Sequence, residues 1–140
     1  MKMSLFNIFD VAGSALNAQT LRLNTTSSNL ANANSASSST DQVYRARQPV
    51  FATMLSNEFE DENGSTGVQV LGIVEKQDPA RAEYNPGHPL ANEEGYVYMP
   101  NVNVIEEMAN MISASRSYQT NVEVMNTTKQ MLMRTISLGQ

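Results

Sequence analysis

The sequence contains no cysteine among its 140 residues and only one histidine. The absence of cysteine excludes disulfide bonds, thiolate catalysis and thiolate metal sites. The chain also has no phosphate-binding glycine loop, nucleophile elbow or metal-spaced histidine cluster, so nothing in the sequence indicates an enzyme or a cofactor. His88 lies within the segment 85–89, whose prolines and glycine are typical of a turn, and we interpret it as a turn residue rather than a catalytic base.

Long hydrophobic runs are absent as well, because no stretch of eighteen apolar residues offers a transmembrane helix. The first ten residues lack a sustained apolar segment and a small-residue cleavage site, so we expect no secretory signal peptide. Nine lysines and arginines face fourteen acids, and no basic patch of the kind that phosphate backbones require is present. The sequence therefore predicts neither membrane insertion nor nucleic-acid binding.

The formal net charge of −5 is concentrated in the middle of the chain. Residues 41–103 carry ten acids against four bases, whereas residues 1–40 have a net charge of +1 and residues 104–140 have none. The acidic run at 58–62 lacks the alternating spacing and the glycine of a calcium loop, so we interpret it as a solvated loop. The nearly neutral ends can pack beside copies of themselves with little Coulomb repulsion.

Each end of the chain carries an apolar stripe with the spacing of one helix face. The side chains recur at alternating steps of three and four, with polar residues in two positions of each stripe. This spacing is typical of helices packed lengthwise against other helices, and it predicts helices over 4–32 and 104–138. The candidate interface residues are Leu5, Phe9, Ala12, Leu16, Leu23 and Leu30 in the first stripe, and Val104, Met108, Met111, Tyr118, Val122, Met125, Leu132 and Ile136 in the second.

The C-terminal stripe is too long for a compact domain of this size to cover. A helix over 104–138 is about 50 Å long at ~1.5 Å per residue, whereas a compact chain of this length has a diameter under roughly 40 Å. Part of the stripe must then project beyond the core, where exposed apolar surface marks an interaction site. The alternative is an antiparallel helix pair within one subunit, which would leave part of each stripe without a partner. We therefore expect the chain to assemble with other molecules.

The middle of the chain is predicted to be rich in β-structure. Residues 43–55 alternate in part, and residues 67–75 form the clearest strand of the sequence. A last short strand is predicted over 95–99. The polar segment 33–42 has no periodicity and is interpreted as a linker. The dipeptide at 63–64, Asn-Gly, is a favoured hairpin turn.

The start of the C-terminal helix has an explicit signal. Asn103 is followed three residues later by Glu106, which is a capping-box arrangement, and Gly139 stands where the helix should stop. The predicted fold class is α+β, mainly α, with long terminal helices packed as a coiled-coil-like pair. The predicted domains are the N-terminal helix over 1–35, a β-rich outer domain with connecting loops over 36–100, and the C-terminal helix over 101–140.

Several short motifs resemble those of the axial proteins of the bacterial flagellum, the family of rod and hook subunits. Residues 29–33 at the end of the first helix and 115–121 in the last helix are similar to the two end signatures of that family. Residues 84–102 and the opening segment 5–16 resemble, more narrowly, the proximal rod members. The signature residues are Asn29, Leu30, Ala31, Asn32, Pro86, Gly87, Gly95, Tyr96, Pro100, Asn101, Arg116, Tyr118 and Gln119.

This resemblance implies a structural subunit of the flagellar basal-body rod, with the terminal helices in an inner tube and the β-rich middle outside. The implied partners are further copies of the chain, other proximal and distal rod subunits, the rod-base adaptor to the MS ring, and the flagellar export apparatus. The implied location is the rod within the periplasmic space, where it transmits motor torque and encloses the export channel. No cofactor is implied. The alternative is a cytoplasmic helical adaptor or export chaperone that binds a partner helix.

Overall fold

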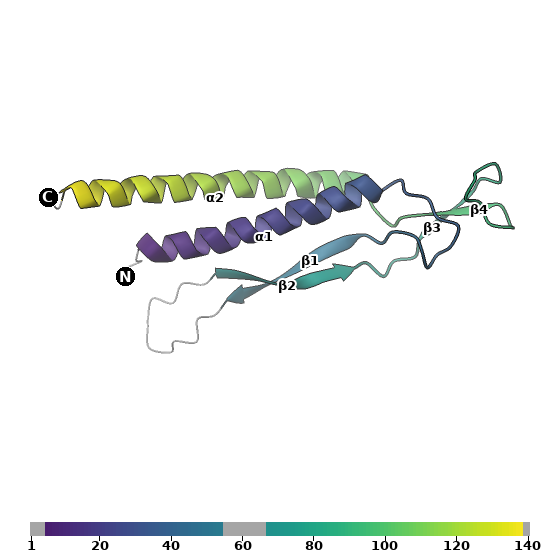
Figure 1. The fold of residues 1–140 in the computed structure, drawn as a ribbon, viewed down its shortest axis with the longest axis horizontal. Coiled ribbons are helices and arrows are strands. Elements are labelled where there is room, and N and C mark those ends of the chain that lie inside the picture. Colours follow the sequence, from purple (N-terminus) through teal and green to yellow (C-terminus); the bar gives the residue numbers. More distant parts are fainter. Residues whose placement is uncertain (1–4, 55–66, 139–140) are drawn as a thin grey trace.

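The structure, a computed structural model, describes residues 5–54 and 67–138 and has an elongated shape (Figure 1). Along the chain the elements are α1 (Leu5–Asn32), β1 (Arg47–Met54), β2 (Gly67–Glu75), β3 (Arg81–Tyr84), β4 (Tyr96–Met99) and α2 (Val104–Leu138). Two long terminal helices therefore flank a small region of antiparallel strands. The predicted fold class, α+β and mainly α, is confirmed, and so are the two predicted helices.

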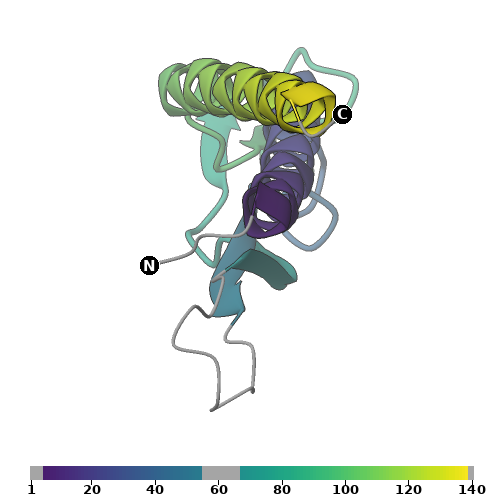
Figure 2. The same cartoon turned by 90° about the vertical axis from the view of Figure 1, so that its left-hand side faces the viewer.

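The two helices run antiparallel along the length of the molecule, and α1 lies between α2 and the β1–β2 hairpin (Figures 1 and 2). Among the helices and strands, α1 contacts α2 on one side and both strands of the hairpin on the other, whereas α2 contacts only α1. The C-terminal end of α2 extends past the start of α1 (Figure 1). One long face of α2 consequently has no covering element within the described part of the subunit.

The strands form two separate antiparallel pairs, β1 with β2 and β3 with β4. The predicted strand over 67–75 is confirmed, whereas the one over 43–55 begins only at residue 47. The last predicted strand is confirmed as β4, but its partner β3 was not predicted. The linker over 33–42 forms no helix, although Ser37 makes an isolated bridge to Tyr98. The acidic run, the turn at 63–64 and Gly139 lie outside the described residues.

The predicted capping box of α2 is confirmed for Asn103 but not for Glu106. The Asn103 Oδ1 accepts hydrogen bonds from the backbone N–H groups of Ile105 at 3.1 Å and Glu106 at 3.3 Å. These bonds satisfy donors that the first turn of a helix leaves without intrahelical partners. The Glu106 carboxylate does not reach back to Asn103, as a capping box requires, because its Oε1 lies 3.6 Å from Lys76 Nζ. This ion pair instead links the first turn of α2 to the residue that follows β2.

Small side chains dominate the interior of the subunit. The buried apolar residues include five alanines, and Ala114 of α2 is fully buried. Small residues allow two helix backbones to approach closely, which suits a long thin pair with no room for a wide core. The buried apolar residues are Ala12, Ala18, Ala33, Val43, Ala46, Val97 and Ala114.

Candidate assembly interface

The face of α2 that packs against α1 repeats every seven residues and is largely polar or small. Glu107, Ala114 and Thr128 are buried, and Asn121 at the same spacing is half-buried. A spacing of seven residues returns to the same side of a helix in an antiparallel pair. Sequence reasoning missed this column because it followed apolar residues, although the spacing itself was visible.

The predicted C-terminal stripe is divided by this packing. Met111, Met125 and Leu132 are half-buried beside the column that faces α1. The other five members are exposed, from 36% for Val122 to 62% for Ile136, and they are Val104, Met108, Tyr118, Val122 and Ile136. Three further apolar residues at helical spacing widen this exposed strip, namely Ile105, Ile112 and Met133. We call these eight residues the outer α2 flank.

The predicted N-terminal stripe is mostly covered within the subunit. Ala12 is buried, and Phe9, Leu16, Leu23 and Leu30 are half-buried, because α1 has neighbours on two sides. The side chain of Leu5 lies outside the described residues. The structure therefore gives much less support to an uncovered stripe on α1 than to one on α2.

A polar face of α2 lies opposite the side that packs on α1. Its members are exposed and recur at steps of three and four, and they are Ser113, Arg116, Thr120, Glu123, Thr127, Gln130 and Arg134. The helix consequently has one face on α1, an exposed apolar flank and an exposed polar face. Such a helix is suited to neighbours along its flank and to water along its polar face.

Two signature asparagines hold the junction between the helices and the β-rich region. Asn29 is 1% exposed, its Nδ2 donates to the Arg47 carbonyl at 2.8 Å, and its Oδ1 accepts from the Arg47 N–H at 2.9 Å. The Tyr44 hydroxyl donates to the same Oδ1 at 2.8 Å. One buried side chain thus fixes the chain where β1 begins.

Asn101 makes the corresponding connection from the other end of the chain. Its Oδ1 accepts from the Ala46 N–H at 2.8 Å, and its Nδ2 donates to the carbonyls of Lys76 at 3.3 Å and Asp78 at 2.9 Å. The adjacent Pro100 is buried. The two asparagines therefore bind consecutive residues, 46 and 47, from the C-terminal end of α1 and the N-terminal side of α2.

The signature residues of the β3–β4 hairpin have local structural roles. Gly95 has φ of +82°, and a Cβ there would lie 2.9 Å from Tyr84 Cε2, so this turn requires glycine. Tyr96 packs edge-on against Tyr84 with ring centroids 5.3 Å apart. Pro86 and Gly87 are exposed in the turn after β3.

Two further signature residues lie at the end of α1. Nδ2 of Asn32 donates to the Ser28 carbonyl at 2.8 Å, and Ala31 is exposed.

The signature residues of α2 differ from these because they face solvent. Arg116 and Gln119 are exposed, and Tyr118 is 37% exposed. In the parts of the chain that the structure describes, their side chains make no hydrogen bond or ion pair. The fold of the subunit therefore does not account for them, whereas it does account for Asn29, Gly95 and Asn101.

His88, interpreted from the sequence as a turn residue, makes a local contact in the structure. His88 lies in a turn, where its Nδ1 accepts from the Leu90 N–H at 3.1 Å. Within residues 5–54 and 67–138, no group of three or more His, Cys, Asp or Glu side chains is placed to hold a metal ion. In the same residues, no helix combines the length and apolar character needed to cross a bilayer.

Two protein-family models match the two ends of the chain. The family described as flagella basal body rod protein matches residues 9–36, within and just beyond α1. The family described as flagellar basal body rod FlgEFG protein C-terminal matches residues 93–138, which include β4 and all of α2. Together with the paired terminal helices, these matches define a structural protein of the flagellar basal-body rod.

Relatives that match over their full length show which family of rod proteins this chain belongs to. The flagellar basal-body rod proteins FlgC of Salmonella typhimurium strain LT2 and Yersinia enterocolitica are 51% and 54% identical to this chain over 138 residues, and FlgC of Buchnera aphidicola subsp. Schizaphis graminum is 43% identical over 140 residues. Each comparison covers 99% of this chain and 100% of the relative. The chain belongs to the FlgC family of flagellar basal-body rod proteins.

Membership of this family settles the broad function. The chain is a structural rod subunit of the flagellar basal body that assembles with other rod components, and it is not an enzyme. The resemblance to flagellar rod subunits and the predicted structural role are confirmed. The alternative of a cytoplasmic adaptor or export chaperone is not favoured.

Proposed function

We propose that the subunit joins the rod through the outer α2 flank, which contacts neighbouring copies or neighbouring rod proteins of the proximal and distal rod and its base. The observation that supports this proposal is the exposure of apolar side chains along α2, including 53% of Met108 and 62% of Ile136. Burying a Leu or Met side chain fully contributes about 1.5–3 kcal/mol. Several such side chains at each contact, repeated around a tube, give a shaft stiff enough to transmit motor torque.

The polar face of α2 supports the second part of the proposal. An exposed face without apolar residues is suited to water, and in a tube of parallel subunits it lines the export channel. The described residues contain no bilayer-spanning helix, which fits a rod that crosses the periplasmic space. The subunit reaches this place through the flagellar export apparatus.

The test is to place a charge on the outer α2 flank. Met108→Glu and Ile136→Glu add carboxylates that remain solvated in the isolated subunit, so folding should be unchanged. In a strain lacking the native protein, we expect normal protein levels, no swimming and no recovery with detergent-extracted basal bodies. The matched controls are Thr127→Glu and Gln130→Glu on the polar face, which should swim. Normal swimming by both flank variants, or recovery of the native protein only from the cytosol, would refute the proposal.

A further inference from the structure

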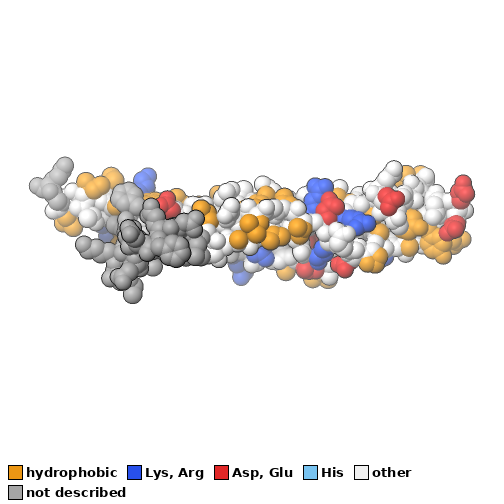
Figure 3. Space-filling view, turned by 90° about the horizontal axis from the view of Figure 1, so that it is seen from below, with side chains coloured by type: hydrophobic (Ala, Val, Ile, Leu, Met, Phe, Trp, Pro, Cys, Tyr) orange, Lys and Arg blue, Asp and Glu red, His pale blue; other side chains and the backbone are white. Residues whose placement is uncertain are grey.

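A polar cavity lies where α1, the first turns of α2 and the start of β1 meet. Its volume is about 370 Å³. Figure 3 shows basic and acidic side chains next to one another in this part of the molecule, where β1 begins and β2 ends. The walls include residues of all three elements, namely Arg22 and Thr26 of α1, Gln48 and Phe51 of β1, and Glu107 and Asn110 of α2.

Two buried polar side chains that line this cavity lack partners. Glu107 is 3% exposed and Thr26 is 4% exposed. Neither side chain forms a hydrogen bond or an ion pair with a residue that the structure describes. A buried polar group without a partner is unfavourable, and an unpaired carboxylate is the most costly case. The fold of the subunit therefore leaves an acceptor and a hydroxyl free toward the cavity.

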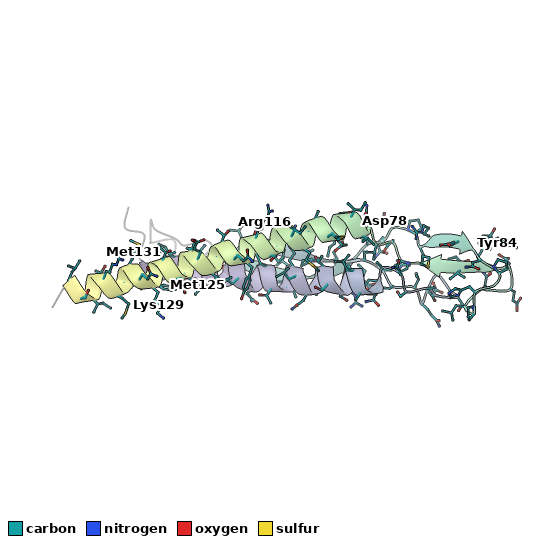
Figure 4. The ribbon with its side chains drawn as sticks, turned by 90° about the horizontal axis from the view of Figure 1, so that it is seen from above. Asp78, Tyr84, Arg116, Met125, Lys129 and Met131 are labelled. Atoms are coloured by element: carbon teal, nitrogen blue, oxygen red, sulfur yellow. The ribbon has the colours of Figure 1, made fainter. Side chains whose placement is uncertain are left out.

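Among the described residues, no cation forms an ion pair with Glu107. Arg22, which lines the same cavity, donates from Nη2 to Asn110 Oδ1 at 3.0 Å, and its guanidinium has further N–H donors. Arg116 lies on the side of α2 away from α1 (Figure 4), so it cannot reach the cavity of its own subunit. The cavity thus contains one anionic acceptor and one cationic donor that are not joined to each other.

The charges around the cavity cancel. Two ion pairs, Arg47 with Glu75 at 3.3 Å and Lys76 with Glu106 at 3.6 Å, are each neutral. The remaining guanidinium and carboxylate also sum to zero. A charged ligand would leave a net charge in a partly enclosed space, where it is poorly solvated. A neutral amide is suited to this pair, because its NH2 group donates to a carboxylate and its oxygen accepts from a guanidinium.

We propose that the cavity binds the side-chain amide of an asparagine or glutamine from a neighbouring subunit of the rod. The amide nitrogen donates to Glu107, and the amide oxygen accepts from Arg22. Phe51 is 37% exposed, so the cavity reaches the surface at the β1 wall, where this ring contacts the aliphatic part of the entering side chain. The contact rests on the proposed rod function and adds to it a polar site separate from the outer α2 flank. Such a site selects the correct neighbour, because any other leaves both charged groups unpaired.

The first test replaces the carboxylate of Glu107 with an apolar side chain. In the isolated subunit, we expect Glu107→Leu to unfold at the same urea concentration as the native chain or at a higher one, because an unpaired buried charge is removed. In a strain lacking the native protein, the amount of this variant in isolated basal bodies should fall about tenfold, which corresponds to ~1.4 kcal/mol. Glu123→Leu, at an exposed position of the same helix, is the matched control and should be incorporated normally.

The second test identifies the group that enters the cavity. A photo-reactive amino acid replaces Gln48 on the β1 wall, isolated basal bodies are irradiated, and the linked peptide is sequenced by mass spectrometry. We expect a link to a second rod subunit within one or two residues of an asparagine or glutamine, and no link in the irradiated isolated subunit. A link to a segment that lacks these residues would contradict the proposal.

The outcomes separate this inference from the proposed function. If Glu107→Leu is incorporated as well as the native chain, or if position 48 links to nothing in basal bodies that contain the protein, only solvent fills the cavity and the inference is overturned, while the rod role stands. Lower stability of isolated Glu107→Leu would also overturn it, because Glu107 would then have a partner within the subunit. Absence of the native protein from basal bodies would instead refute the rod role itself.

Discussion

Asn29 binds both backbone groups of Arg47, donating from Nδ2 to its carbonyl at 2.8 Å and accepting at Oδ1 from its N–H at 2.9 Å. An asparagine side chain has one donor group and one acceptor group, so a single residue can replace the pairing that a neighbouring strand would give. Arg47 is the first residue of β1. A signature residue of α1 thereby helps to position the start of the hairpin against the helix.

We expect Asn29→Ala to lower the free energy of unfolding by about 2–3 kcal/mol, because it removes two part-buried hydrogen bonds to the Arg47 backbone and empties the buried position of the Asn29 amide. Urea unfolding of the isolated subunit, followed by circular dichroism, measures this change. Asn24→Ala is the matched control on the same helix, since Asn24 is exposed; it should change stability by less than about 0.5 kcal/mol. Equal unfolding midpoints for the two variants would contradict the role of Asn29.

The close approach of the helices gives a second prediction. Ala114 has no exposed surface, and a leucine there must push α2 away from α1. We expect Ala114→Leu to destabilise the subunit by about 1–3 kcal/mol. Ala109→Leu makes the same substitution at an exposed position of α2 and should alter stability by less than about 0.5 kcal/mol. Thermal unfolding of both variants provides the comparison, and a tolerated leucine at 114 would show that the helices are loosely packed.

The turn before β4 gives a third prediction. Gly95→Ala forces an alanine into a left-handed conformation and places its Cβ against the Tyr84 ring, which should cost about 1–3 kcal/mol locally. Because the β3–β4 hairpin is small, we expect amide exchange within this hairpin to become faster, and the global melting temperature to fall only slightly. Gly72→Ala is the control, since no atom lies within 4 Å of its added Cβ. Unchanged exchange in Gly95→Ala would contradict the glycine requirement.

The helices and the clearest strand were predictable because their patterns repeat over many residues. β3 was not predictable, because its four residues, Arg81–Tyr84, are all exposed and show no alternation of burial. The face of α2 on α1 was not identified from the sequence for a related reason. It uses Glu107 and Thr128 where an apolar residue is expected, and only the packing of two helices makes those positions interior.

The candidate interface of α2 was predictable as a stripe of apolar residues. Which members of the stripe α1 covers, and which stay exposed, was not predictable. Spacing alone places Val122 and Leu132 on the same side of a helix, and one sequence cannot say which of them a partner helix of the same chain covers. The signature residues likewise have different roles that the sequence does not separate, because Asn101 serves the subunit fold and Arg116 faces solvent. Hydrogen bonds between segments distant in the chain cannot be read from local patterns.

The division of the stripe gives the last prediction, a contrast between Leu132→Asp and Val122→Asp. Leu132 is half-buried beside the face on α1, so aspartate there should lower the free energy of unfolding by about 2–4 kcal/mol. Val122 is 36% exposed, and aspartate there should cost about 1 kcal/mol or less in the isolated subunit. We expect neither variant to swim, but for different reasons: urea unfolding and immunoblotting should find the Leu132 variant unstable and depleted, and the Val122 variant folded and abundant. Normal swimming of the Val122 variant would show that α2 contacts no neighbour at that position.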